Sequence, residues 1–386
     1  MKDVFIVGAS RSPIASVKRG TDGKKNTSCI SSLAPHELAG AVYDNLFSFG
    51  IPHTAVDMFR LGSLISQKTE PTSFHAPAKH ILMAGRTERK RRINALTLEG
   101  ACATGLIAIE DATEEIMLGR SDCAIAGGVD MMSRNFDSDV VAVLTSPETG
   151  KNMAMLADSK ARALGISRYE LDLYASQSYS WARYHKNDHG RFIVPIYLSG
   201  ASTPILTHDE GVDKARSLAM LQKVDPMSGC EIITPAHASK YGDAAAFVAL
   251  ASLEAVKIHG FRPLAIIRSI ESYSEGNPES FITAPNGAIQ KALLSAGVSI
   301  KDVDTFLINE AFAPSPIHFI KTFNIPREMV NPWGGAIACG HPFGATGAVL
   351  LVMLLTILLK SESLRFGVVA ICAAGGESTA CVIERI

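Results

Sequence analysis

The sequence lacks an excess of either charge and lacks a long apolar run. Its 386 residues include 37 Lys and Arg against 38 Asp and Glu, a formal net charge of -1. A nearly neutral chain has no overall field that would draw it to nucleic acid or to an anionic membrane surface. The longest apolar run, residues 347–359, is shorter than the roughly 18–20 residues that span a bilayer. We therefore expect no nucleic-acid partner and no membrane span, and we interpret this run as a helix buried on all sides.

The sequence also lacks paired cysteines and the common nucleotide-binding motifs. None of its seven cysteines forms a C-x-x-C pair, which argues against a zinc site or a redox dithiol. Neither a P-loop nor a G-x-G-x-x-G after a strand is present. Free thiols indicate a reducing compartment, and the strand-like run at residues 4–7 leaves no room for a signal peptide. We expect a cytoplasmic protein. One basic run, residues 86–92, is open to two interpretations, a solvated loop or a local anion contact.

Two glycine-rich segments at opposite ends of the chain carry a cysteine and a histidine. Residues 99–105 contain Cys102 and open an apolar helical stretch, whereas residues 340–347 contain His341. A second thiol, Cys372, follows further on and is itself followed by small residues and a glycine pair. A thiol nucleophile, an imidazole and a second thiol are the groups needed to hold an acyl group as a thioester and to make or break the adjacent C–C bond.

Both ends of the chain follow the same plan of turn, helix, turn, strand and glycine pair. In the first half, a helix is predicted over 105–118 and an apolar strand over 123–126. In the second half, a helix is predicted over 345–359 and an apolar strand over 368–371. Strands that are apolar throughout are typical of sheets with both faces covered by helices. The sequence therefore predicts two similar α/β layers packed on each other.

The middle of the chain, residues 130–241, has a different texture with scattered proline, glycine and charged residues. It includes a predicted helix at 153–164 and a capping box formed by Ser167 and Glu170. We interpret it as an inserted segment with its own small structure, the kind of insertion that commonly carries binding loops. After it, a further helix rich in small residues is predicted from Asp243 to about His259.

Each candidate residue has a chemical and a structural interpretation. At a helix start, the helix dipole would lower the pKa of Cys102, although a free cysteine is more often a small buried hydrophobe. His341 is either a base for the thiol or a structural histidine. Cys372, at a strand end, could move a proton, and the amides that follow it could form an oxyanion hole. Asn309 follows the strand-like run 305–308, where its amide positions a water or a carbonyl, or caps a helix.

The order of these motifs resembles the thiolase family, which includes acetyl-CoA acetyltransferases and 3-ketoacyl-CoA thiolases. The resemblance runs nearly end to end, and the segments that carry it are 7–13, 99–105, 126–133, 165–168, 309–312, 334–342 and 368–376. It implies an α/β fold of five layers, αβαβα, built from two similar halves and an inserted loop domain. The implied N-terminal half is 1–129, completed by about 242–265. The implied loop domain, which binds coenzyme A, is 130–241, and the C-terminal half is 266–386.

The resemblance also implies a ping-pong mechanism with neither metal nor prosthetic group, in which coenzyme A is a substrate. Cys102 would take the acyl group, with His341 assisting its deprotonation, and Cys372 would move the proton at the α-carbon or at the departing thiol. His341 and a water held by Asn309 would stabilise the enolate oxygen. The backbone amides of Cys102 and Ala374 would form the second oxyanion hole.

The same resemblance suggests where acyl-CoA and CoA are bound and how the chain assembles. The implied substrate contacts are Ser239, Met153, Phe281, Phe312 and Lys214. A homodimer or homotetramer is expected, with a β-oxidation subunit as a further partner to consider. The implied reaction is the thiolytic cleavage of 3-oxoacyl-CoA to acetyl-CoA and a shortened acyl-CoA, or the reverse condensation of two acetyl-CoA.

Three residues depart from the family pattern. Glu99 and His237 stand where the family often has asparagine, and Asp213 stands where it often has a basic contact to CoA. These departures support an alternative function, a catalytically weak, thiolase-like subunit that binds CoA esters or acts as a scaffold.

Overall fold

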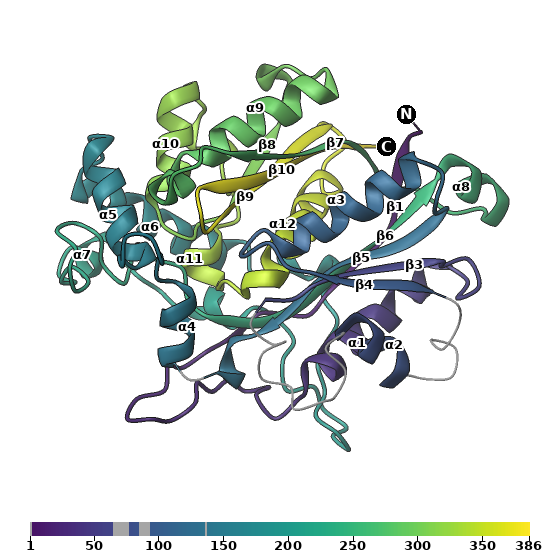
Figure 1. The fold of residues 1–386 in the computed structure, drawn as a ribbon, viewed down its shortest axis with the longest axis horizontal. Coiled ribbons are helices and arrows are strands. Elements are labelled where there is room, and N and C mark those ends of the chain that lie inside the picture. Colours follow the sequence, from purple (N-terminus) through teal and green to yellow (C-terminus); the bar gives the residue numbers. More distant parts are fainter. Residues whose placement is uncertain (1, 65–76, 85–92, 136) are drawn as a thin grey trace.

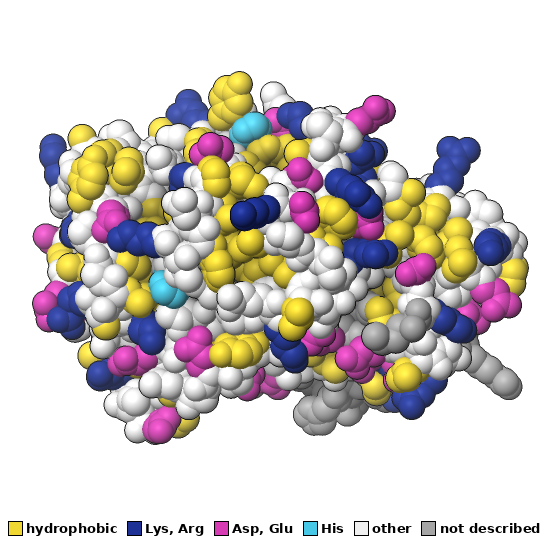
Figure 2. All heavy atoms as spheres, turned by 90° about the horizontal axis from the view of Figure 1, so that it is seen from above, with side chains coloured by type: hydrophobic (Ala, Val, Ile, Leu, Met, Phe, Trp, Pro, Cys, Tyr) yellow, Lys and Arg dark blue, Asp and Glu magenta, His cyan; other side chains and the backbone are white. Residues whose placement is uncertain are grey.

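The computed structural model describes residues 2–64, 77–84, 93–135 and 137–386. The basic run at 86–92 lies outside this described part of the chain. On the face seen in Figure 2, acidic and basic side chains are interspersed with apolar ones, in keeping with the small net charge. Among the described helices, none combines the length and the apolar character needed to cross a membrane.

The described strands form one mixed sheet made of two halves that share a core of four strands in the same order, β3-β5-β6-β1 and β8-β9-β10-β7. Its path is β4-β3-β5-β6-β1-β7-β10-β9-β8, with the short β2 paired to β6. The strands are β1 (Val4–Arg11), β2 (Ala15–Ser16), β3 (Met58–Gly62), β4 (Asn94–Leu98), β5 (Cys123–Met131), β6 (Gly242–Ser252), β7 (Ala265–Ser274), β8 (Thr305–Ile308), β9 (Phe366–Ala373) and β10 (Glu377–Arg385).

The two halves meet where β1 and β7 pair antiparallel, with Phe5 opposite Ile266. In the first half, β3 and β5 are parallel and β6 pairs antiparallel with β5. In the second half, β8 and β9 are parallel and β10 pairs antiparallel with β9. The prediction of two similar α/β layers is confirmed.

Helices cover both outer faces of the sheet and fill the space between its halves. α3 (Thr104–Met117) and α12 (Phe343–Leu358) lie in the middle, in contact with strands of both halves. α1 (Pro35–Asn45) and α2 (Pro77–Ala84) cover the first half, and α9 (Ala284–Ala296) and α10 (Pro314–Phe323) cover the second. Figure 1 shows the resulting sequence of layers, from α9 and α10 at the top to α1 and α2 at the bottom. The predicted αβαβα architecture is confirmed, and α12 is buried along its whole length as expected.

The helix predicted from Asp243 to His259 is wrong over most of its length. Residues 242–252 form β6, and only Leu253–His259 form a helix, α8, which Ser252 caps by accepting a hydrogen bond from the Ala255 N–H. A short run of small apolar residues has no periodicity that separates a buried strand from a buried helix. β6 lies between β5 and β1 and is buried throughout, so tertiary packing overrides the helix propensity of its alanines. β5 likewise continues through the glycine pair at 127–128 to Met131 instead of turning there.

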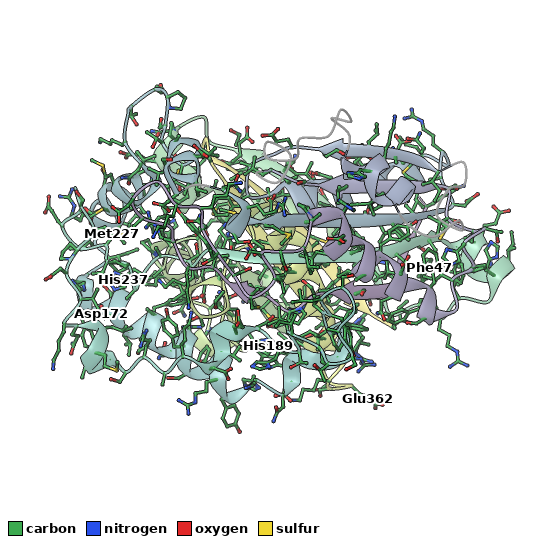
Figure 3. The ribbon with its side chains drawn as sticks, turned by 90° about the horizontal axis from the view of Figure 1, so that it is seen from below. Phe47, Asp172, His189, Met227, His237 and Glu362 are labelled. Atoms are coloured by element: carbon green, nitrogen blue, oxygen red, sulfur yellow. The ribbon has the colours of Figure 1, made fainter. Side chains whose placement is uncertain are left out.

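The described part of the chain between β5 and β6 adds four α-helices at one end of the molecule. They are α4 (Asp137–Val143), α5 (Met153–Ala163), α6 (Arg168–Tyr184) and α7 (Leu218–Leu221). The capping box predicted for Ser167 and Glu170 is present at the start of α6. Figure 3 shows Asp172, Met227 and His237 of this segment at the same end.

Candidate active site

Cys102 and His341 come together because the two central helices cross at glycines close to their N-termini. Each residue lies two positions before its helix, α3 or α12. A Cβ atom on Gly105 would lie 2.5 Å from the carbonyl oxygen of Gly344, so neither helix could approach the other so closely with a larger residue there. The Gly344 N–H also donates to Asp130 Oδ2 over 2.7 Å, which fixes the start of α12. This crossing places the thiol and the imidazole on one cavity.

Cys102 lies on a strained turn and is largely buried. The residue before it, Ala101, has a φ of 49°, in the left-handed region that costs an alanine roughly 1–2 kcal/mol. The Cys102 side chain is 9 % exposed. Burial raises the pKa of its thiol well above the usual range, with smaller contributions from Cys372 and Asp130. The predicted lowering of the Cys102 pKa is therefore wrong for the resting enzyme, because loss of solvation outweighs the helix dipole.

His341 is buried and presents one free nitrogen. Its Nδ1 is 2.6 Å from the hydroxyl oxygen of Thr346, in the first turns of α12. Its Nε2 is buried and has no hydrogen-bond partner among the described residues. Burial lowers the pKa of His341 to about 3. The imidazole is therefore neutral at physiological pH and available to accept a proton at its unbonded nitrogen.

Cys372 and Asn309 lie at the ends of neighbouring strands in the second half. Cys372 is on β9 and is 2 % exposed, and burial raises the pKa of its thiol to about 12. Asn309 follows β8, where its N–H donates to Ala370 O over 2.9 Å. The Asn309 amide partly offsets the rise in the Cys372 pKa, which indicates that its side chain lies against the thiol. Both polar atoms of the Asn309 side chain are buried, and neither forms a hydrogen bond of ordinary geometry with a described residue. They therefore remain available to a water or a substrate oxygen.

Most of the predicted site residues line one cavity of about 480 Å³. The structure brings together the groups from both halves and from the segment between β5 and β6, namely Cys102, Met153, Ser239, Phe281, Phe312, His341, Cys372 and Ala374. Phe281 and Phe312 meet edge to face, with ring centroids 6.0 Å apart. Asn309 lies buried beside Cys372 instead of on the cavity wall. Lys214 does not reach the cavity lining; its Nζ donates to the Ser16 hydroxyl oxygen over 3.2 Å.

A short segment, 237–241, ties the cavity walls together through main-chain hydrogen bonds. The Ser239 N–H donates to Ala311 O over 3.0 Å, and the His341 N–H donates to Lys240 O over 2.7 Å. Next to Asn309, the buried Glu310 carboxylate accepts hydrogen bonds from the Tyr174 hydroxyl and the Ser178 hydroxyl, both at 2.8 Å. These contacts hold the loops of the second half against the inserted segment.

The three departures from the family pattern lie outside the cavity lining. Glu99 is exposed. His237 is fully buried and pairs with Asp172, with 2.7 Å between Nε2 and Oδ1. Asp213 is at the surface, where Lys186 and His208 lie 2.6 and 2.8 Å from its carboxylate oxygens.

Sequence reasoning missed four polar residues of the cavity wall, Arg19, Asn152, Lys240 and Tyr241, and the Thr346 contact to His341. Thr346 could have been found, because a threonine in the first turns of the helix that follows His341 can reach back to it. Nothing in the sequence marked Arg19, which reaches the cavity from an N-terminal loop and forms an ion pair with Asp137, 118 positions away.

One buried cluster has the donor set of a metal site. Ligand atoms of His189, Asp209 and Cys339 lie within 4.8 Å of one another. The Arg11 guanidinium, however, donates to both oxygens of the Asp209 carboxylate, at 2.8 and 2.9 Å. A cation would compete with this buried arginine, so the cluster is better explained as an ion-pair network that joins β1 to the inserted segment.

Comparison with known families covers almost the whole chain. The model of the thiolase N-terminal domain matches residues 4–254, and that of the thiolase C-terminal domain matches residues 261–385. The chain belongs to the thiolase family.

Individual relatives and solved structures agree with this membership. The chain is 32 % identical to the "Probable acetyl-CoA acetyltransferase" of Dictyostelium discoideum, over all of this chain and 95 % of that protein. It is 30 % identical to the 3-ketoacyl-CoA thiolase of Bacillus subtilis over the full length of both chains. The fold superposes on the Bacillus anthracis acetyl-CoA acetyltransferase with a TM-score of 0.89 at 28 % identity, covering 100 % of this chain and 99 % of the other.

Proposed function

We propose that this thiolase-family chain cleaves 3-oxoacyl-CoA with coenzyme A, giving acetyl-CoA and a shortened acyl-CoA, and catalyses the reverse condensation of two acetyl-CoA. The observation that carries the proposal is the presence of two buried thiols and a buried, neutral imidazole on one cavity. A family match alone would leave the chemistry open, since a fold does not fix a function. The presence of both thiols and the imidazole on one cavity supports catalysis over a scaffold role.

In the proposed cleavage, Cys102 Sγ attacks the 3-oxo carbon while its proton passes to His341 Nε2. The C2–C3 bond breaks, leaving an acyl-Cys102 thioester and the enolate of acetyl-CoA. The Cys372 thiol, which its raised pKa keeps protonated, gives its proton to C2 of that enolate. Asn309 and His341 would stabilise the enolate oxygen, His341 from its protonated Nε2 and Asn309 through a water. The backbone amides of Cys102 and Ala374 would stabilise the oxygen of the acyl group on Cys102.

The second half of the cycle restores the enzyme. A coenzyme A thiol gives its proton to the Cys372 thiolate and attacks the acyl-Cys102 carbonyl. The Cys102 sulfur leaves and takes back the proton from His341. Coenzyme A thus enters as a substrate and leaves as acyl-CoA, and no other group is needed to balance the steps.

We assign the substrate contacts to the same cavity. Human mitochondrial 3-ketoacyl-CoA thiolase, 27 % identical to this chain with a TM-score of 0.88, has been solved in complex with CoA. By analogy, Ser239 and Met153 of the inserted segment 130–241 would hold the pantetheine arm, and Phe281 and Phe312 would line the acyl pocket. Lys214 is not included in this assignment, because it is not part of the cavity lining and its ammonium donates to the Ser16 hydroxyl. A homodimer or homotetramer remains the expected assembly.

A thiolysis assay tests the proposal. The purified protein is mixed with acetoacetyl-CoA and coenzyme A, and loss of the 3-oxoacyl-CoA is followed by absorbance. Cys102→Ser should abolish turnover, whereas Cys230→Ser, which alters a half-buried thiol outside the cavity lining, should retain it. No turnover by the wild-type protein with 3-oxoacyl-CoA of several chain lengths would reject the proposed function.

A further inference from the structure

The candidate active-site cavity carries a positive charge that no acidic side chain of the described residues neutralises. Its lining contains two cationic side chains, Arg19 and Lys240, and no carboxylate among the described residues. The Arg19 guanidinium is compensated, because two of its nitrogens donate to the two carboxylate oxygens of Asp137. Lys240 has no carboxylate oxygen within 4.0 Å of its ammonium in the described part of the chain. It is therefore the uncompensated cation of this cavity.

The Lys240 ammonium is held in place and keeps one donor unused by the described residues. Its Nζ donates to Ala238 O over 2.9 Å and also to Pro235 O. An ammonium has three N–H donors, so one remains. The Lys240 main chain is fixed as well, since its carbonyl oxygen accepts the His341 N–H over 2.7 Å. The cation thus belongs to a part of the cavity wall that is hydrogen-bonded to the main chain of His341.

The surroundings of Lys240 favour an arriving anion. The charged groups that act on it are Lys214 and Arg216, both cationic. Burial, reinforced by these two neighbours, lowers the Lys240 pKa to about 8. Lys240 is half-buried, and its ammonium contacts two carbonyl oxygens and no carboxylate among the described residues. Such a cation gains from a negative partner, which replaces the hydration it has lost and offsets the repulsion from Lys214 and Arg216.

We propose that the Lys240 ammonium binds an anionic oxygen of the substrate inside this cavity. The inference rests on the proposed function, because it assumes that an acyl-CoA occupies the cavity. Two parts of such a substrate carry the required chemistry, a terminal carboxylate on the acyl group and a phosphate of coenzyme A. The first source would make the chain selective for 3-oxoacyl groups derived from dicarboxylic acids. The second source would make Lys240 a residue that binds the coenzyme A part of every substrate.

Lys240→Met tests the proposal, because methionine preserves the stem and removes the charge. KM is measured for a neutral 3-oxoacyl-CoA, for a counterpart that ends in a carboxylate, and for the pantetheine thioester of each. A charged hydrogen bond is worth enough to raise KM about tenfold or more when it is lost. If the carboxylate is the partner, the rise is confined to the two carboxylated substrates. If a phosphate is the partner, the rise affects both CoA thioesters and neither pantetheine thioester.

Controls separate recognition from damage to the fold. Lys223→Met removes a positive charge from an exposed position in the same inserted segment and should leave every KM unchanged. Lys240→Arg should restore most of the affinity. Substrate affinity of the wild type should fall between pH 7 and 9 as Lys240 loses its proton, and that of Lys240→Arg should not. Unchanged KM values in Lys240→Met, or equal losses with all four substrates, would overturn the inference.

The same test works if turnover is absent. Calorimetric titration of the wild type and Lys240→Met with coenzyme A, and with saturated acyl-CoA with and without a terminal carboxylate, gives dissociation constants that require no catalysis. A protein that binds these ligands through Lys240 but cleaves none of the 3-oxoacyl-CoA substrates would reject the proposed function and retain the inference. Equal dissociation constants in the two proteins would reject the inference.

Discussion

The close crossing of α3 and α12 should be more important for turnover than for stability, and Gly105→Ala tests this. The alanine Cβ would lie 2.5 Å from Gly344 O and 3.4 Å from Ala348 N, both of them backbone atoms that no side-chain rotation can move. Ordinary contact begins at 3.4 Å, so the two helix starts must separate by about 0.9 Å. That displacement acts directly on Cys102 and His341, each two residues before its helix.

The expected magnitudes follow from this displacement. A misplacement of about 1 Å between reacting groups costs on the order of 100-fold in rate. Overpacking destabilises by about 1–3 kcal/mol, and the better helix propensity of alanine returns about 1 kcal/mol. We therefore predict that kcat for thiolysis falls about 100-fold while the melting temperature falls by only a few degrees.

The assay compares kcat and melting temperature in the wild type, Gly105→Ala and Gly190→Ala. Gly190 is exposed, and a Cβ there would meet nothing within 4 Å, so its variant should match the wild type in both measurements. Wild-type kcat in a folded Gly105→Ala protein would refute the reasoning that this crossing sets the distance between the thiol and the imidazole.

Three further predictions concern charges and hydrogen bonds. Burial raises the pKa of Cys102 and lowers that of His341 to about 3, so both groups are neutral in the resting enzyme. The rate of Cys102 alkylation by iodoacetamide should therefore rise steadily toward alkaline pH, without an inflection between pH 5 and 8. Thr346→Val removes the partner of His341 Nδ1 and should lower kcat about tenfold with little change in KM, as measured in the thiolysis assay. Asp209→Asn leaves the buried Arg11 guanidinium without its counter-charge and should destabilise the fold by about 3–5 kcal/mol in a denaturant titration.

Each of these predictions has a control or a contrary outcome. An inflection near pH 6 in the alkylation profile would reveal a thiolate–imidazolium pair and contradict the neutral resting state. Thr346→Ser keeps the hydroxyl and should recover the lost rate. Asp213→Asn breaks exposed ion pairs and should cost less than about 1 kcal/mol, so an equal loss in the two aspartate variants would reject the argument from burial.

The architecture was accessible from the sequence where strong patterns repeat. The helix over 345–359 and the strand over 368–371 carry enough apolar residues to be recognised. The same pattern of helix and strand at 105–118 and 123–126 predicts the paired layers. β6 was not accessible, because its small residues suit a helix as well as a strand and only its neighbours β5 and β1 decide.

The sequence was enough to predict the residues of the candidate site, but not their pKa values or the orientation of their charged groups. The motifs indicate Cys102, His341 and Cys372, and the structure lines one cavity with all three. The pKa of Cys102 depends on how much water its thiol loses, which only the assembled fold determines, so the helix-start argument gave the wrong direction. The orientation of Lys240 is likewise a tertiary property, because it rests on two carbonyl oxygens of its own loop.

The most direct test of the proposed mechanism is the mass of the protein after incubation with acetyl-CoA. The mechanism predicts one acetyl group, located by peptide mapping on Cys102, released coenzyme A in equal amount, and loss of the acetyl group when coenzyme A is added. The Cys102→Ser variant should gain no thioester. Absence of any acyl group on Cys102, with acetyl-CoA and with 3-oxoacyl-CoA alike, would contradict the assignment of this cysteine as the nucleophile.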